Sequence, residues 1–176
     1  ADFSKECVVL EGFPLVTIPT NVNLEHEYIA FSSTALINAT VVADNSVSKQ
    51  VSEVIEVIYP QLEKGSKINF HVYALTQKYG ILESGRADIV KGKINLALKK
   101  KSIHCLRKGF DRSIAFLQIL ILPDRSMAVS YITKKELPSF HSLISPFVGG
   151  FSNVEDDKKA PSRAFKKLIE AQEVMG

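Results

Sequence analysis

In the segment Lys67-Ile-Asn-Phe-His-Val-Tyr-Ala74, apolar and polar side chains alternate without interruption. Ile68, Phe70 and Val72 fall on one side of an extended chain, and the residues between them fall on the other. A period of two is typical of a strand that buries one face and exposes the other to water. The segment therefore predicts a half-buried β-strand with a core on one side.

An amphipathic helix is predicted on the N-terminal side of this strand. Its apolar side chains recur at helical spacing, and they are Val47, Val51, Val54, Ile55, Ile58 and Leu62. The polar run Asp44-Asn45-Ser46 supplies a cap at its start, and Pro60 breaks or ends it. The turn residues Gly65 and Ser66 then lead into the strand.

A second helix is predicted on the C-terminal side of the strand, with Ser84 as its cap. Its apolar stripe consists of Val90, Ile94, Ala97 and Leu98, and its other face is rich in lysine. Two further strands, Phe116–Leu122 and Met127–Ile132, are joined by a turn sequence suited to a hairpin. The order helix, strand, helix, strand, strand places the chain in the α/β class, as an α+β arrangement of helices packed on a mixed sheet.

We divide the chain into four parts. Residues 1–45 form a small β-rich N-terminal lobe, residues 46–133 the main module, residues 134–160 a linker and residues 161–176 a terminal helix. The strands expected in the lobe are Cys7–Leu10, Leu15–Ile18 and Ala35–Ala43. Gly149 and Gly150 are expected to make the linker flexible.

The composition excludes several classes of protein. The chain has 176 residues, of which 45% are hydrophobic and 23% charged, which is typical of a globular domain. Its two cysteines are far apart and its four histidines are isolated, so neither a disulfide framework nor a metal site is indicated. No stretch has the apolar length of a membrane span or the layout of a signal peptide, so we expect no membrane partner and a cytoplasmic location.

The formal net charge is +3, and much of the positive charge is clustered. Five lysines lie on the second predicted helix or at its end, and three more cations follow in the loop 104–113. These candidates for RNA binding are Lys91, Lys93, Lys99, Lys100, Lys101, Arg107, Lys108 and Arg112. Clustered cations bind a phosphate backbone by releasing its counterions. On composition alone, a solvated helix face followed by a flexible basic loop is the better explanation of them.

Two segments resemble known families. The order of elements over residues 46–133, with a basic second helix and a closing hairpin, resembles a THUMP domain, an RNA-binding module of enzymes that modify tRNA and rRNA. The stretch Ser162-Arg-Ala-Phe-Lys-Lys-Leu-Ile-Glu-Ala171 resembles the helix that introduces the catalytic domain of FtsJ/RrmJ-like RNA ribose 2'-O-methyltransferases. Together with Ser145-Pro-Phe147, it is similar to the subgroup that methylates cytidine in large-subunit rRNA.

The resemblance implies a parent enzyme that uses S-adenosylmethionine, with Lys167 as the first lysine of a Lys-Asp-Lys-Glu catalytic set. The other members of that set have no matching motif in this chain, so we expect no methyl transfer by these residues alone. The implied partners are rRNA and a C-terminal methyltransferase domain belonging to the same protein. The alternatives are a stand-alone adaptor that binds RNA or protein and, less well supported, a small hydrolase or nuclease.

Overall fold

The computed structural model describes residues 8–9, 16–17, 34–76, 80–82 and 85–150. Its two helices are α1 (Val47–Ile58) and α2 (Gly85–Lys100). Six strands form the main sheet, namely β3 (Thr40–Val42), β4 (Lys67–Thr76), β5 (Gly80–Leu82), β6 (His104–Cys105), β7 (Phe116–Ile121) and β8 (Met127–Ile132). Short 3-10 helices are η2 (Tyr59–Gln61), η3 (Leu137–Phe140) and η4 (Val148–Gly150).

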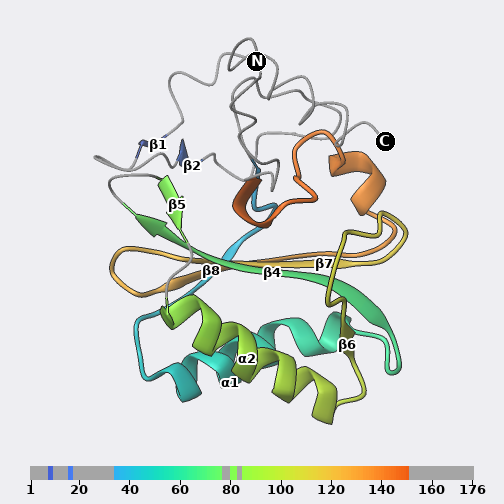
Figure 1. Ribbon diagram of the computed structural model, residues 1–176, viewed down its shortest axis with the longest axis horizontal. Coiled ribbons are helices and arrows are strands. Elements are labelled where there is room, and N and C mark those ends of the chain that lie inside the picture. The colour runs from blue at the N-terminus through green and yellow to red at the C-terminus, as the bar shows by residue number, and fades with distance from the viewer. Residues whose placement is uncertain (1–7, 10–15, 18–33, 77–79, 83–84, 151–176) are drawn as a thin grey trace, which may run out of the picture.

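The main sheet is mixed. Its strand order is β3-β8-β7-β4-β5, and β6 pairs with the first residues of β4. Strands β4 and β7 are parallel, whereas β7–β8, β3–β8 and β4–β5 are antiparallel. Helices α1 and α2 cover one face of this sheet, and the segments 34–38 and 133–150 cover the other (Figure 1). The fold is therefore α+β, as the sequence predicted.

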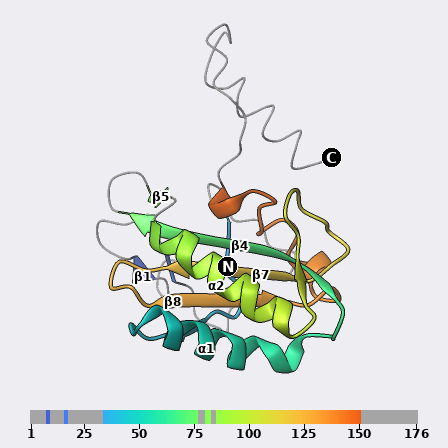
Figure 2. The same cartoon turned by 60° about the horizontal axis from the view of Figure 1, so that its bottom comes forward.

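The helix layer forms as expected. The Ser46 side chain accepts a hydrogen bond from the backbone N–H of Lys49, which caps the start of α1, and the chain tightens into η2 at Pro60. The two helices lie side by side on the same face of the sheet (Figure 2). Val54 and Ile58 from α1, together with Ile94 and Leu98 from α2, are completely buried against it. The apolar stripes read from the sequence are thus the faces that the helices bury.

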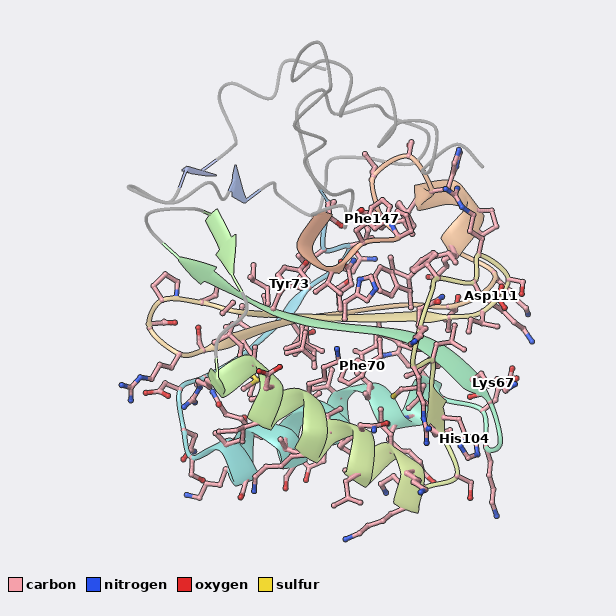
Figure 3. All side chains as sticks on the ribbon, viewed as in Figure 1. Lys67, Phe70, Tyr73, His104, Asp111 and Phe147 are labelled. Carbon is pink, nitrogen blue, oxygen red and sulfur yellow. The ribbon has the colours of Figure 1, made fainter. Side chains whose placement is uncertain are left out.

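Strand β4 differs from its prediction, because both of its faces are buried. Phe70 points toward the helices and Tyr73 toward the opposite layer (Figure 3). Asn69, His71 and Tyr73, which were expected to meet solvent, are 1%, 6% and 1% exposed. The polar atoms of Asn69 and Tyr73 tolerate burial because they have hydrogen-bond partners there, namely the backbone of Asp111 and the side chain of Gln118.

The predicted strand Ala35–Ala43 is also shorter than expected. Only Thr40–Val42 pairs with the sheet, and residues 34–38 cross its second face as an irregular segment. Gln118 Nε2 donates to the carbonyl of Ala35 at 2.9 Å, and Ser130 Oγ donates to that of Ile37 at 2.6 Å. Polar side chains of the sheet therefore replace the strand pairing that this segment lacks.

Residues 134–150 are closely packed, although we expected a linker there. Leu137, Leu143 and Ile144 are buried with Ile37 and Phe116 in a second core on this face of the sheet. Gly149 is buried and has a φ of 63°, a conformation that favours glycine. Residues 34–45 and 134–150 thus pack on the same sheet as the module 46–133.

Some predictions fall only partly within the described residues. Val8–Val9 and Val16–Thr17 form strands β1 and β2, which pair antiparallel, inside the two short strands expected for the N-terminal lobe. The hairpin of β7 and β8 is confirmed, with its turn held by Asp124.

Ser84 and the segment 151–176, including Lys167, lie outside the described residues. In the part of the chain described here, no helix has both the length and the apolar character needed to cross a membrane.

Candidate nucleic-acid interface

The lysines predicted to bind RNA lie at the surface, on and directly after α2. Lys91, Lys93, Lys99, Lys100 and Lys101 are all exposed. Among the described residues, the ion pairs join Arg86 to Asp44 and Lys134 to Glu63, each at 3.7 Å. None of the five lysines is therefore neutralised by an ion pair with a described carboxylate, and their charge is available to an anionic partner.

Two of these lysines also hold the helices together. Lys93 Nζ lies 3.4 Å from Ser48 Oγ on α1. Lys101 Nζ lies 3.9 Å from the centre of the Tyr59 ring, which is a cation–π contact. Since both contacts are at the surface, each contributes about 1 kcal/mol or less. Lys91, Lys99 and Lys100 have no such contact among the described residues.

The outward face of α2 is less polar than the sequence suggested. Ile89 and Leu96 are each 55% exposed, and Gly92 lies on the same side of the helix between them. At 100° per residue, these three positions lie opposite the buried stripe of Val90, Ile94 and Leu98. We described this face from its lysines and missed the two large apolar side chains, although their spacing of seven residues was readable.

The basic loop leaves the end of α2 and crosses one end of the sheet. His104, at its start, lies on the helix side, and Asp111, near its end, lies on the opposite side, with Lys67 of β4 at the same end of the sheet (Figure 3). Arg107, Lys108 and Arg112 are exposed along this loop. The loop therefore places cations from the helix layer round to the second face.

The end of this loop is fixed in place by Asn69. The Asn69 side chain donates through Nδ2 to the carbonyl of Asp111 at 2.7 Å and accepts at Oδ1 from the N–H of the same residue at 2.8 Å. The Asp111 carboxylate accepts from the N–H and the hydroxyl of Ser113, and these hydrogen bonds lower the pKa of Asp111. Phe110 and Arg112, which flank Asp111, are positioned by these contacts.

A cavity of about 360 Å³ opens between the loop and η3. Phe110 and Arg112 form the loop side, and Leu137, Pro138 and His141 form the η3 side. The remaining wall comes from Ile144 and Pro146. The lining is mostly apolar, with two basic side chains, which is a usual composition for a ligand pocket.

An aromatic cluster supports the loop side of this cavity. The Phe110 ring meets the Phe116 ring edge to face at 4.9 Å, and His71 meets Phe116 in the same way at 4.8 Å. Burial, and secondly the charge of Lys91, lowers the pKa of His71 to about 4, so the ring is neutral at pH 7. Within the described residues, His71 Nδ1 is buried without a hydrogen-bond partner. His71 thus behaves as a packing residue rather than as a base open to solvent.

The sequence offers three aromatic side chains that could stack on unpaired bases, namely Tyr73, Tyr79 and Phe110. Tyr73 is 1% exposed and its hydroxyl lies 3.3 Å from Gln118 Oε1, so its ring is a core ring and cannot stack on a base. Tyr79 lies outside the described residues. Phe110 lines the cavity between the loop and η3.

The described residues contain no cluster of side chains suited to holding a metal ion. No group of three His, Cys, Asp or Glu side chains is gathered among them. Burial raises the pKa of the Cys105 thiol to about 12, which makes it a poor nucleophile. The structure thus offers no support for the hydrolase or nuclease alternative in this part of the chain.

Comparison with protein-family models and with curated proteins found no relationship. The chain matches no protein-family model, and no curated protein matches it. The case for a function therefore depends on the residues themselves.

Proposed function

We propose that this chain is an RNA-binding module of an S-adenosylmethionine-dependent rRNA 2'-O-methyltransferase, and that it docks rRNA for ribose methylation by a catalytic domain. One observation carries the binding part of the proposal: exposed lysines on and directly after α2 have no carboxylate partner among the described residues, and the basic loop 104–113 follows them in the chain. The enzymatic part rests on the resemblance of Ser162–Ala171 to the start of the catalytic domain. S-adenosylmethionine and Lys167 belong to that part.

The basic surface suits a nucleic acid better than a small anion. The cations are spread along α2 and the loop instead of converging on one point, so they match an extended row of phosphates. The loop 104–113, which passes one end of the sheet between His104 and Asp111 (Figure 3), adds the exposed Arg107, Lys108 and Arg112. Binding should therefore be strongly dependent on salt and should vary little with base sequence.

The test is the salt dependence of binding to short rRNA hairpins. Each phosphate contact that is lost lowers the slope of log K against log salt by about 1. We expect Lys100→Gln to lower it by that amount, because Lys100 is exposed on the basic face. Arg125→Gln is the matched control, since it removes one charge from the β7–β8 turn at the opposite end of the sheet.

An equal effect of both variants would contradict a defined RNA surface on α2. Undetectable binding at low salt, combined with no loss on changing Lys99, Lys100 and Lys101 to glutamate, would refute RNA binding altogether. Methyl transfer is tested separately, with the protein extended by its own downstream sequence, where Lys167→Ala should abolish activity without weakening RNA binding.

A protein-binding adaptor is the second candidate, and the exposed Ile89 and Leu96 favour it. A partner that covers them would bury an apolar strip on the outward face of α2. In that case Ile89→Asp should abolish partner binding, while affinity for RNA should be unchanged. Under the RNA proposal, Ile89→Asp adds a negative charge beside the lysines and weakens RNA binding modestly.

A further inference from the structure

The cavity between the basic loop and η3 combines features that the lysines of α2 do not provide. It is lined by residues of the loop, of η3 and of the segment 144–146, it contains an aromatic ring, and it lies where the basic loop ends. Its volume of about 360 Å³ is at the lower end of the range of roughly 300–1,000 Å³ typical of small-ligand pockets. A space of this size suits one ring system rather than a long chain.

The walls of the cavity are held rigidly. On the loop side, Asn69 is 1% exposed and binds both backbone groups of Asp111, between Phe110 and Arg112. On the η3 side, Glu136 accepts hydrogen bonds from the N–H and the hydroxyl of Thr133, which fixes the start of the 3-10 helix. Since hydrogen bonds within the protein fix both walls, binding would cost little conformational entropy.

The polar groups at the cavity suit a nucleotide. Arg112 offers a planar fork of N–H donors that matches phosphate oxygens, and Arg107 and Lys108 precede it in the same loop. His141 Nδ1 lies 2.9 Å from the carbonyl of Pro138. Because a carbonyl can only accept, Nδ1 donates to it, which leaves Nε2 for a hydrogen bond with a ligand.

We propose that this cavity receives one unpaired nucleobase of the bound RNA, stacked against Phe110, with an adjoining phosphate on Arg112. The proposal rests on the proposed RNA-binding function and adds to it a preference for single-stranded positions. Unpaired bases in loops and bulges are free to leave their own stack and lie against aromatic side chains, whereas bases within a duplex are not. The α2 lysines would then hold the backbone of the neighbouring duplex.

The experiment compares two RNA hairpins that carry the same phosphates. One has a short loop of ordinary nucleotides, and in the other the loop nucleotides are abasic. We expect the protein to bind the first more tightly, and both with the same dependence on salt. Loss of a stacked base costs roughly 5- to 150-fold in affinity, so the expected difference is at least about fivefold.

The variant Phe110→Leu should remove this difference. It should weaken binding of the ordinary hairpin to the level of the abasic one and leave the abasic one unchanged. Phe140→Leu is the matched control, because Phe140 packs in the same core as Phe110 but does not line the cavity. It should retain the full preference for the ordinary loop.

The outcomes separate the two proposals. If both hairpins bind with equal affinity and a steep dependence on salt, RNA binding by the α2 lysines is supported and the base pocket is refuted. If neither hairpin binds at low salt, both proposals fail. Should Phe110→Leu not fold, a fluorescent base analogue in the loop tests the unaltered protein, because stacking on Phe110 must change its emission and an unchanged emission on binding excludes the pocket.

Discussion

Replacing His71 with phenylalanine should remove a large part of the acid sensitivity of this fold. His71 is 6% exposed and its Nδ1 has no hydrogen-bond partner among the described residues. Burial, and secondly the charge of Lys91, lowers its pKa from 6.5 to about 4. The unfolded chain therefore takes up a proton near pH 6.5, whereas the folded protein resists doing so until about pH 4.

The sign and size of the effect follow from these two values. Between pH 6.5 and about 4 the unfolded state binds more protons, so the free energy of unfolding decreases as the pH decreases. The stability that depends on His71 being neutral in the folded protein is fully present above pH 6.5. At 1.36 kcal/mol per pH unit, the interval from 6.5 to about 4 amounts to about 3 kcal/mol.

The assay is urea unfolding between pH 7.5 and 4.5. The contribution of His71 is the difference between the unaltered protein and His71→Phe in how much their free energy of unfolding changes over this range. Carboxylates elsewhere titrate in both proteins, so their effect cancels. Phenylalanine keeps the ring contacts with Phe110 and Phe116, and we expect a change of less than about 1.5 kcal/mol at pH 7. Lys91→Gln should reduce the acid sensitivity only in part, because its charge is the smaller cause. Parallel loss of stability in the unaltered protein and His71→Phe would refute this account of His71.

Two further predictions concern the helix layer. Gly92→Ala should raise the free energy of unfolding in urea by about 1 kcal/mol. A Cβ at this position inside α2 meets no atom within 4 Å, and alanine favours the helix. A loss of stability would show that the space beside Gly92 is occupied. Gln50→Leu should destabilise it by about 3 kcal/mol, because the fully buried Gln50 amide donates to the carbonyls of Ala43 and Arg125 and accepts from Arg86. An unchanged unfolding midpoint for Gln50→Leu would mean that these hydrogen bonds contribute no net stability.

The helices and the hairpin were predictable because their signals are local. The spacing of apolar residues in 47–62 fixes the face that α1 buries, and Pro60 ends the helix by its own geometry. The turn of the hairpin likewise depends on neighbouring residues, since the Asp124 carboxylate binds the N–H and hydroxyl of Ser126. Each of these features is determined within a few residues along the chain.

The second layer was not predicted, because its partners are far apart in sequence. Gln118 binds Ala35, and Ser130 binds Ile37, across 83 and 93 positions. One local signal was present in the sequence: Phe116–Ile121 is an almost unbroken apolar run, and a strand without alternation needs cover on both faces. All six residues are indeed buried. From this run the sequence indicates that a second layer exists, but not which segment provides it.

Asn69 shows why alternation alone misleads at the candidate site. A polar residue at every second position is usually read as solvent-facing, yet the Asn69 amide is buried because one backbone unit, that of Asp111, satisfies both its donor and its acceptor. This pairing across 42 positions joins the start of β4 to the loop that carries Phe110 and Arg112. Asn69→Leu would keep the volume and the burial but lose both bonds. The same side chain that breaks the simple strand pattern therefore gives the loop the fixed geometry that a binding pocket requires.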